Sequence, residues 1–369
     1  MTKKLVIAGV SAMQAWDEGA RPYARPSRMR SPGSFASTID ELESFSVLPQ
    51  GCSYPVDVLT GNVSSRHRSR KWLAHPRRSP LPSGSLRDIG NDRYLISPGF
   101  FFLQTAPKLS MPQAILLGME LCGYYSTLMS VPYRSYCESM YGKGVASLTK
   151  PWPPAEWEMS LGHQQDLIDN GFVVRDPLLN AEDLTRYLSS SLSQNSNSRA
   201  LSAARLVVGD SRSPMESRLY ARYCFPRRYG GLNLSPVELN AGFPLPEDIV
   251  RATGIHNYSV DLFWPDGAIG IEYQGRFAHS GLSAEQKDRL KRNILETYGV
   301  QIISVDREQY QNEDLLELFG ARIAKSMGIP PWKQKLTTRE KAKRTELIAE
   351  LNDWSCDLYR PKSNGGSCR

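Results

Sequence analysis

The 369-residue sequence has no closely spaced cysteines, no long apolar run and no repeat of fixed period. Its six cysteines form neither a CxxC motif nor a metal-ligand spacing with the five histidines. This excludes the common zinc modules and indicates a reduced, intracellular protein. No stretch approaches the roughly 18 apolar residues of a membrane span. We therefore expect a soluble, cytoplasmic protein with no membrane partner.

The first residues resemble the basic and apolar parts of a secretory signal peptide, but no cleavage site follows them. Lys3 and Lys4 precede the apolar run 5–10, yet no small-residue cleavage pattern follows, and the run leads into Trp16. A buried β-strand explains this run better than a signal peptide does.

Positive charge is concentrated at the two ends of the chain. Of the overall net charge of +7, residues 1–78 carry +6 and residues 331–369 carry +4, which leaves −3 for the middle. Basic ends around a faintly acidic centre suit a protein that grips a polyanion and holds cations at its centre. Two solubilising tails would give the same pattern.

Composition and spacing divide the chain into four parts. The Ser/Asn-rich stretch 189–199 is the best candidate for a linker. It separates an expected α+β N-terminal domain at 1–188 from a second domain at 200–330, and a basic helical tail follows at 331–369. We interpret the N-terminal domain as a region that binds DNA or a partner protein, and a homodimer stays open.

Apolar patterns predict the main elements of the N-terminal domain. Residues 111–128 have the spacing of an amphipathic helix, with Ser110 as its N-cap, and helical segments are expected between 180 and 205. Short apolar runs predict strands at 54–60, 94–96 and 100–103.

The second domain begins with a helix start. Ser213 is placed as the N-cap, Pro214 lies in the first turn, and Glu216 would complete a capping box, so a helix is expected to about Cys224.

Two short apolar runs follow, at 258–265 and 268–275, and then a helix that Gly299 closes before a β-branched strand at 300–305. Because the second helix forms a crossover, its flanking strands should lie parallel in one sheet.

The link between the two apolar runs brings two acids together. Asp266-Gly267 predicts a two-residue type I′ turn, which places Asp261 directly opposite Glu272, with Cβ atoms roughly 4.5–5.5 Å apart. Such a pair destabilises a hairpin unless a positive charge lies between the acids, and Mg²⁺ favours carboxylate ligands. We therefore expect Asp261 and Glu272 to hold Mg²⁺ or Mn²⁺. A solvated polar face with both acids exposed is the alternative.

Other polar residues surround this pair. By strand alternation Gln274 points to the same side as Glu272. Glu216 is either a third catalytic group or only a capping residue. Three more are candidates for phosphate contact or proton transfer, against the alternatives of a plain loop histidine and a solvated helix face: His279, Arg289 and Arg292.

These residues resemble a known enzyme core. Glu216 in a helix, Asp261 on a strand and Glu272-Tyr273-Gln274 on the next resemble the PD-(D/E)XK (restriction-endonuclease-like) nucleases. The continuation through His279 and the segment 287–300 is similar to the branch related to very short patch repair endonucleases. Upstream, the segments 56–59 and 121–126 loosely resemble abortive-infection (AbiEi-like) antitoxin and regulator proteins.

The resemblance implies an α/β fold with a mixed central sheet flanked by helices. It implies that Asp261 and Glu272 bind Mg²⁺ and that Glu216 assists. Two residues depart from the family pattern. Gln274 stands where the family has a lysine that is thought to orient the attacking water, and Val260 stands where the family name has a proline.

The sequence thus predicts a Mg²⁺-dependent endonuclease that hydrolyses DNA phosphodiester bonds, in phage defence or a mobile element. A catalytically inactive DNA-binding regulator or antitoxin-like protein with the same fold is the alternative, which the loss of lysine at position 274 favours. In either case the basic ends would contact DNA phosphates through Arg66, Arg68, Arg70, Lys71, Arg77, Arg78, Lys341, Lys343 and Arg344.

Overall fold

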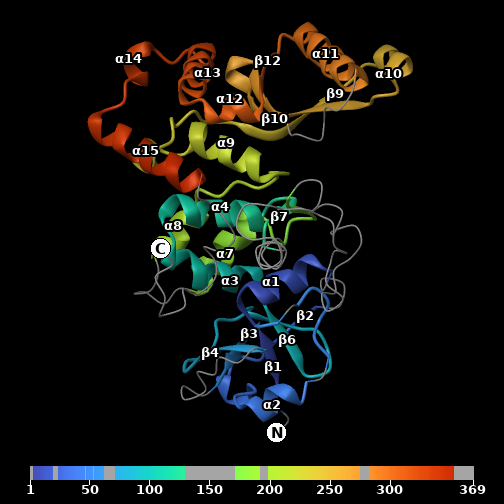
Figure 1. Cartoon of the computed structure of the whole chain (residues 1–369), viewed down its shortest axis with the longest axis vertical. Coiled ribbons are helices and arrows are strands. Elements are labelled where there is room, and N and C mark those ends of the chain that lie inside the picture. Colours follow the sequence, from blue (N-terminus) through green and yellow to red (C-terminus); the bar gives the residue numbers. More distant parts are fainter. Residues whose placement is uncertain are drawn as a thin grey trace, which may run out of the picture. The chain divides into compact units, whose positions relative to one another are not determined.

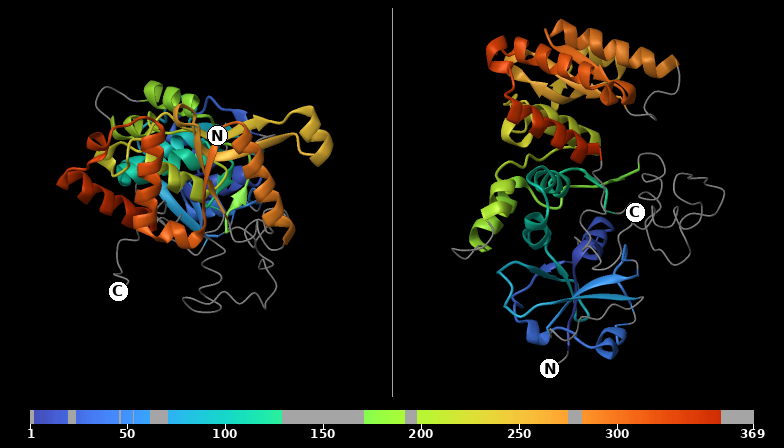
Figure 2. Two further views of the ribbon diagram at one scale, coloured as in Figure 1. Left: turned by 90° about the horizontal axis from the view of Figure 1, so that it is seen from above. Right: turned by 60° about the vertical axis from the view of Figure 1, so that its left-hand side comes forward.

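The computed structural model describes residues 3–19, 24–45, 47–52, 54–61, 71–128, 171–191, 198–274 and 282–352 (Figures 1 and 2). Contacts between residues divide the chain into two compact units, with the boundary between Val207 and Val208. Both units are mixed α/β. Within the described ranges, no helix is long and apolar enough to span a membrane.

The described part of the first unit contains a six-stranded mixed sheet in the order β2-β5-β6-β1-β3-β4. β1 lies parallel to β6 and antiparallel to β3, and β3 lies parallel to β4. The strands are β1 (Leu5–Ile7), β2 (Arg25–Pro26), β3 (Val56–Thr60), β4 (Trp72–Pro76), β5 (Leu86–Asp88) and β6 (Arg93–Ile96). The strands expected at 54–60 and 94–96 are confirmed.

The buried strand expected at 5–10 is confirmed only in its first half. β1 ends at Ile7, and Gly9 begins a helix, α1 (Gly9–Asp17), with a φ of +54°. A Cβ atom at Gly9 would lie 2.8 Å from the side chain of Asp57. The glycine therefore allows the sharp change from strand to helix against β3.

Short helices and a two-stranded ribbon accompany the sheet in the described part of the first unit. α3 contacts α4 and α7, and α8 contacts α4 and α7. α8 thus belongs to the first unit, so the boundary between the units lies beyond the linker expected at 189–199. The elements are η1 (Pro32–Ser34), α2 (Ile39–Glu43), α3 (Pro98–Thr105), η2 (Ala106–Lys108), α4 (Met111–Leu121), β7 (Tyr125–Ser126), β8 (Val173–Val174), α7 (Ala181–Ser191) and α8 (Ser198–Ala204).

The strand expected at 100–103 is wrong, because these residues lie in α3. Ser97 caps this helix by accepting a hydrogen bond from the backbone N–H of Phe100, and Pro98 occupies its first turn. This start signal outweighs the strand preference of three consecutive, fully buried phenylalanines at 100–102. The helix expected over 111–128 begins at its Ser110 cap but ends at Leu121, before β7.

The second unit contains a four-stranded sheet of described residues in the order β12-β11-β10-β9. β9, β10 and β11 are antiparallel, and β11 and β12 are parallel, as the crossover helix predicted. Its elements are α9 (Pro214–Cys224), η3 (Arg227–Tyr229), β9 (Glu238–Pro244), α10 (Glu247–Thr253), β10 (Asn257–Trp264), η4 (Pro265–Gly267), β11 (Ile269–Tyr273), α11 (Leu282–Thr297), β12 (Gln301–Val305), α12 (Arg307–Gln311), α13 (Glu313–Ser326), α14 (Pro331–Gln334) and α15 (Thr338–Asn352).

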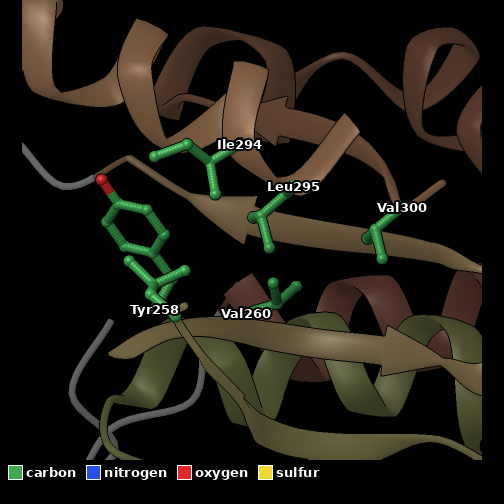
Figure 3. Packing of buried hydrophobic residues seen from close by; sticks show 6 residues of the cluster. Tyr258, Val260, Ile294, Leu295 and Val300 are labelled. Carbon is green, nitrogen blue, oxygen red and sulfur yellow. The ribbon is translucent and has the colours of Figure 1, made fainter. Parts of the chain in front are cut away.

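Helices pack against this sheet through two different sets of residues. From α11, Ile294 and Leu295 pack with Tyr258 and Val260 of β10 in one apolar cluster (Figure 3). From α9, Tyr223 packs edge-to-face on Trp264 of β10, with the ring centroids 6.1 Å apart. The central strand β10 is therefore held by both helices, and residues of both can reach its polar side chains.

The β10–β11 hairpin has the expected register but a different turn. Leu262 pairs with Ile271 and Trp264 with Ile269, as the two-residue turn predicted. The loop is instead the short 3-10 turn η4 followed by Ala268 in the left-handed region, with a φ of +44°. Pro265 fixes the φ that begins a 3-10 turn, so four loop residues replace the type I′ turn without shifting the strands.

Candidate active site

Glu216 is a buried acid on α9 that faces the sheet. Its backbone N–H donates to the N-cap hydroxyl of Ser213, 3.2 Å away, as expected. Its carboxylate does not complete the capping box. Oε2 instead accepts hydrogen bonds of 2.8 Å from the backbone N–H of Arg212 and from the amide of Asn240. Burial raises the pKa of Glu216, although these two hydrogen bonds oppose the rise.

Asn240 of β9 was not recognised in the sequence, and it holds Glu216 in place. Its Nδ2 donates to the Glu216 carboxylate and also to the backbone carbonyl of Asp210, 2.8 Å away. Its φ of +51° lies in the left-handed region, which asparagine tolerates better than most residues. The sequence offers no signal for Asn240, because the segment 238–244 has little strand preference of its own.

Asp261 lies where β10 and β11 stop pairing. The last pair of the ladder is Leu262–Ile271, and Asp261 and Glu272 are the next residues outward on the two strands. The Oδ2 atom of Asp261 accepts a hydrogen bond of 2.8 Å from the backbone N–H of Tyr273. The carboxylate therefore continues the ladder in place of a backbone carbonyl.

Asp261 and Glu216 form an electrostatically strained pair. Burial, followed by the negative charge of Glu216, raises the pKa of Asp261 to about 7. The hydrogen bond from Tyr273 and the charges of Lys291 and Arg212 act in the opposite direction. Glu216 is thus a second acid near Asp261, in addition to Glu272, which the hairpin register predicted.

Glu272 forms an ion pair with Lys291 of α11. The lysine Nζ also donates a hydrogen bond of 2.6 Å to the carbonyl oxygen of Ser259 and lies 5.8 Å from the ring centroid of Tyr258. The charge of Lys291 lowers the pKa of Asp261 as well. The ammonium group of Lys291 therefore interacts electrostatically with two acids of the site, Glu272 and Asp261.

Lys291 is a further site residue on the helix for which the sequence predicted only Arg289 and Arg292. It lies three and four residues before Ile294 and Leu295, so it belongs to the same helix stripe as two buried core residues. A lysine within the apolar stripe of an amphipathic helix is a signal for a buried partner.

Gln274 lies beside Glu272, on the side that strand alternation predicted. With Lys291, Arg292 and Ser304, these two residues line a recess of about 10 Å³, roughly the space of one water molecule. Arg292 Nη2 donates to the hydroxyl of Ser304, 3.2 Å away, so Arg292 lies at this recess. Arg289 is exposed, and His279 lies outside the described residues.

The basic side chains expected to contact DNA differ in their exposure. Lys71, Arg78 and Lys341 are exposed, and Arg77 is half-buried with its guanidinium over the ring of Phe100. Lys343 forms an ion pair with Glu346. Arg344 differs from the expectation, since only 4% of it is exposed. Arg66, Arg68 and Arg70 lie outside the described residues.

The donor set of the acid cluster fits a hard divalent cation. Among the described residues, no group of three or more His, Cys, Asp or Glu side chains is arranged as a metal site. Asp261 and Glu216 nevertheless offer oxygen ligands only, and each has a raised pKa. A bound cation would stabilise both carboxylates in their charged forms, which is the property that a Mg²⁺ or Mn²⁺ site requires.

Comparison of the chain with protein-family models, with curated proteins and with solved structures gave no match. The function is therefore argued from the geometry of the site.

Proposed function

We propose that this protein is a divalent-metal-dependent phosphodiesterase that cleaves DNA. The observation that carries the proposal is the convergence of Asp261, Glu216 and the Glu272–Lys291 ion pair on the hairpin between α9 and α11. Acids with raised pKa values next to a lysine are costly to fold, and such arrangements concentrate at functional sites.

The order of elements in the second unit supports the proposal. A helix with an acid, a hairpin with an acid on each strand, a crossover helix and a parallel strand follow one another from α9 to β12. The PD-(D/E)XK resemblance implies a mixed sheet flanked by helices with acids at these places, so fold and site favour the same class of enzyme.

Asp261 is the central residue of the proposed site. With Glu216 near it and Glu272 opposite it in the hairpin, Asp261 would hold Mg²⁺ or Mn²⁺. When bound, such a cation polarises the scissile phosphate and lowers the pKa of a water molecule. The hydrogen bond from the Tyr273 N–H fixes the orientation of the Asp261 carboxylate before any cation binds.

Lys291 takes the role that the missing lysine at position 274 leaves open. Its ammonium reaches the recess that Gln274 and Glu272 line, although it comes from α11 and not from β11. There it would stabilise the negative charge that develops on the phosphoryl oxygens. The amide of Gln274 would position the attacking water, for which the recess has about the right size.

Cleavage of a supercoiled plasmid tests the proposal. We expect nicking in Mg²⁺ or Mn²⁺ that stops with a chelator and is lost in Asp261→Ala and in Glu272→Ala. Asp266→Ala is the matched control, since Asp266 is an exposed acid in the turn of the same hairpin. Equal, salt-sensitive DNA retention by all four proteins without cleavage would contradict the enzyme and support the non-catalytic regulator.

A further inference from the structure

The first unit contains a fully buried acid that the proposed nuclease site does not use. Glu120 of α4 is 0% exposed, and its Oε1 accepts a hydrogen bond of 2.6 Å from the backbone N–H of Thr127. The hydroxyl oxygen of Thr127 lies 3.0 Å from both carboxyl oxygens of Glu120. Because a hydroxyl has one proton, it can donate to only one of these two oxygens. The other oxygen is satisfied when Glu120 itself carries a proton and donates it to the hydroxyl.

The cation beside Glu120 is already paired with another acid. Arg175, which directly follows β8, places its Nε 2.6 Å from Oδ1 of Asp17 at the end of α1, and both side chains are buried. The two Nη atoms of Arg175 donate to the backbone carbonyls of Gly123, Asp176 and Glu120, and none of them donates to the Glu120 carboxylate. Two buried carboxylates therefore share one guanidinium, and an ionised Glu120 would leave one buried negative charge uncompensated.

The other described elements that pack on α4 bring no buried charge to Glu120. α3 contains no titratable residue, and the charged residues of η2 and α8, Lys108 and Arg199, are exposed. β7 contributes only the buried, neutral Tyr125 and Ser126. Burial therefore raises the pKa of Glu120 to about 7, with the charge of Asp17 acting in the same direction, against the hydrogen bonds from Thr127 and the charge of Arg175.

The same contacts hold both strands of the β7–β8 ribbon. Thr127 directly follows β7, Arg175 directly follows β8, and the hydroxyl of Ser126 in β7 donates to Asp17 at 2.6 Å. We propose that Glu120 is a pH switch, which holds the β7–β8 ribbon on α4 and α1 while it carries a proton and releases the ribbon when it ionises. This inference does not depend on the proposed nuclease activity.

Amide hydrogen exchange of the full-length protein at pH 6 and pH 8 tests this proposal, read in peptides that cover 120–128 and 171–178. In the open ribbon Glu120 reaches water and ionises near pH 4.3, so the protection of these amides, corrected for intrinsic rates, should fall roughly tenfold between the two pH values. Glu120→Gln cannot ionise and should keep equal protection at both. Glu182→Gln, which changes an exposed acid of α7, is the matched control and should keep the tenfold fall. Equal protection of the wild type at both pH values, or the same fall in Glu120→Gln, would overturn the proposal.

A second variant keeps the test decisive if Glu120→Gln fails to fold. Asp17→Asn keeps an acceptor for the Ser126 hydroxyl but removes the charge that competes for Arg175. Arg175 then compensates an ionised Glu120, so the fall in protection between pH 6 and pH 8 should shrink to less than roughly threefold. A fall in Asp17→Asn as large as in the wild type would contradict the shared guanidinium and with it the switch.

Discussion

Lys291 of α11 forms an ion pair with Glu272 of β11, and the two side chains are only 21% and 19% exposed. The same ammonium donates to the carbonyl oxygen of Ser259 on β10. Lys291 thus joins the crossover helix to both strands of the hairpin. It also supplies, next to Gln274, the positive charge that position 274 lacks.

Lys291→Gln should reduce the rate of DNA cleavage by about 10²–10³-fold, the usual effect of losing one donor that stabilises transition-state charge. Substrate binding should change less, because the lysine acts mainly on charge that develops during the reaction. Single-turnover cleavage at saturating protein measures the effect. Lys325→Gln is the control, since Lys325 is exposed at the end of α13. A rate within threefold of wild type, a change in activation free energy on the order of 0.6 kcal/mol, would show that Lys291 has no role in catalysis.

Gln274→Lys should restore cleavage to Lys291→Gln by at least roughly tenfold, because both side chains reach the same recess. In the wild-type background Gln274→Lys should add little, since the recess already contains an ammonium group and a second one is repelled. The comparison of the four proteins in one cleavage assay measures this coupling. Independent, multiplicative effects of the two substitutions would show that they do not share a role.

The raised pKa of Asp261 predicts how stability depends on pH in metal-free buffer. The folded protein has a pKa of about 7 for this group, whereas an unfolded aspartate titrates near 3.9. Between about pH 4 and 7 the folded state binds more protons than the unfolded state, so the contribution of Asp261 to stability falls as the pH rises through this window.

Asp261→Asn keeps an acceptor for the Tyr273 N–H but carries no charge. We therefore expect it to melt about 5 °C above wild type at pH 8, and above wild type by less than half of that difference at pH 5. Thermal unfolding in the presence of a chelator measures the difference at both pH values. A difference that is equal at pH 5 and pH 8 would contradict the assigned environment of Asp261.

Asn240 makes a separate prediction about the backbone of β9. Asn240→Ala should destabilise the protein by about 2–3 kcal/mol, because it loses the hydrogen bonds to Glu216 and Asp210 and places an alanine at a positive φ. Asn240→Gly should cost about 1 kcal/mol less, since glycine adopts this conformation readily. Urea unfolding of both variants measures the difference. Equal destabilisation by the two substitutions would mean that the left-handed conformation at position 240 adds nothing to the loss of stability in Asn240→Ala.

The hairpin could be predicted from the sequence because its register depends on local residues. The Asp266-Gly267 pair and the strand alternation placed Asp261 opposite Glu272 and Gln274 beside Glu272, even though Pro265 changes the turn itself. The strand pairs keep the predicted register because the observed loop 265–268 and the predicted turn 266–267 are centred on the same point of the chain.

The remaining residues of the site depend on long-range packing that no local pattern shows. β9 has little strand preference of its own, with an asparagine, a glycine and a proline among its seven residues, and it exists through its pairing with β10. Asn240 could therefore not be placed. The closeness of Glu216 to Asp261 results from the packing of α9 on β10, and that of Lys291 from the packing of α11.

Binding of Mn²⁺, measured by calorimetry without any substrate, tests the central claim that Asp261 is the core of a divalent cation site. We predict one Mn²⁺ per wild-type chain, an affinity at least roughly tenfold weaker in Asp261→Asn, and no change in Asp266→Asn. Binding that is absent from the wild type, or equal in the wild type and Asp261→Asn, would contradict the account.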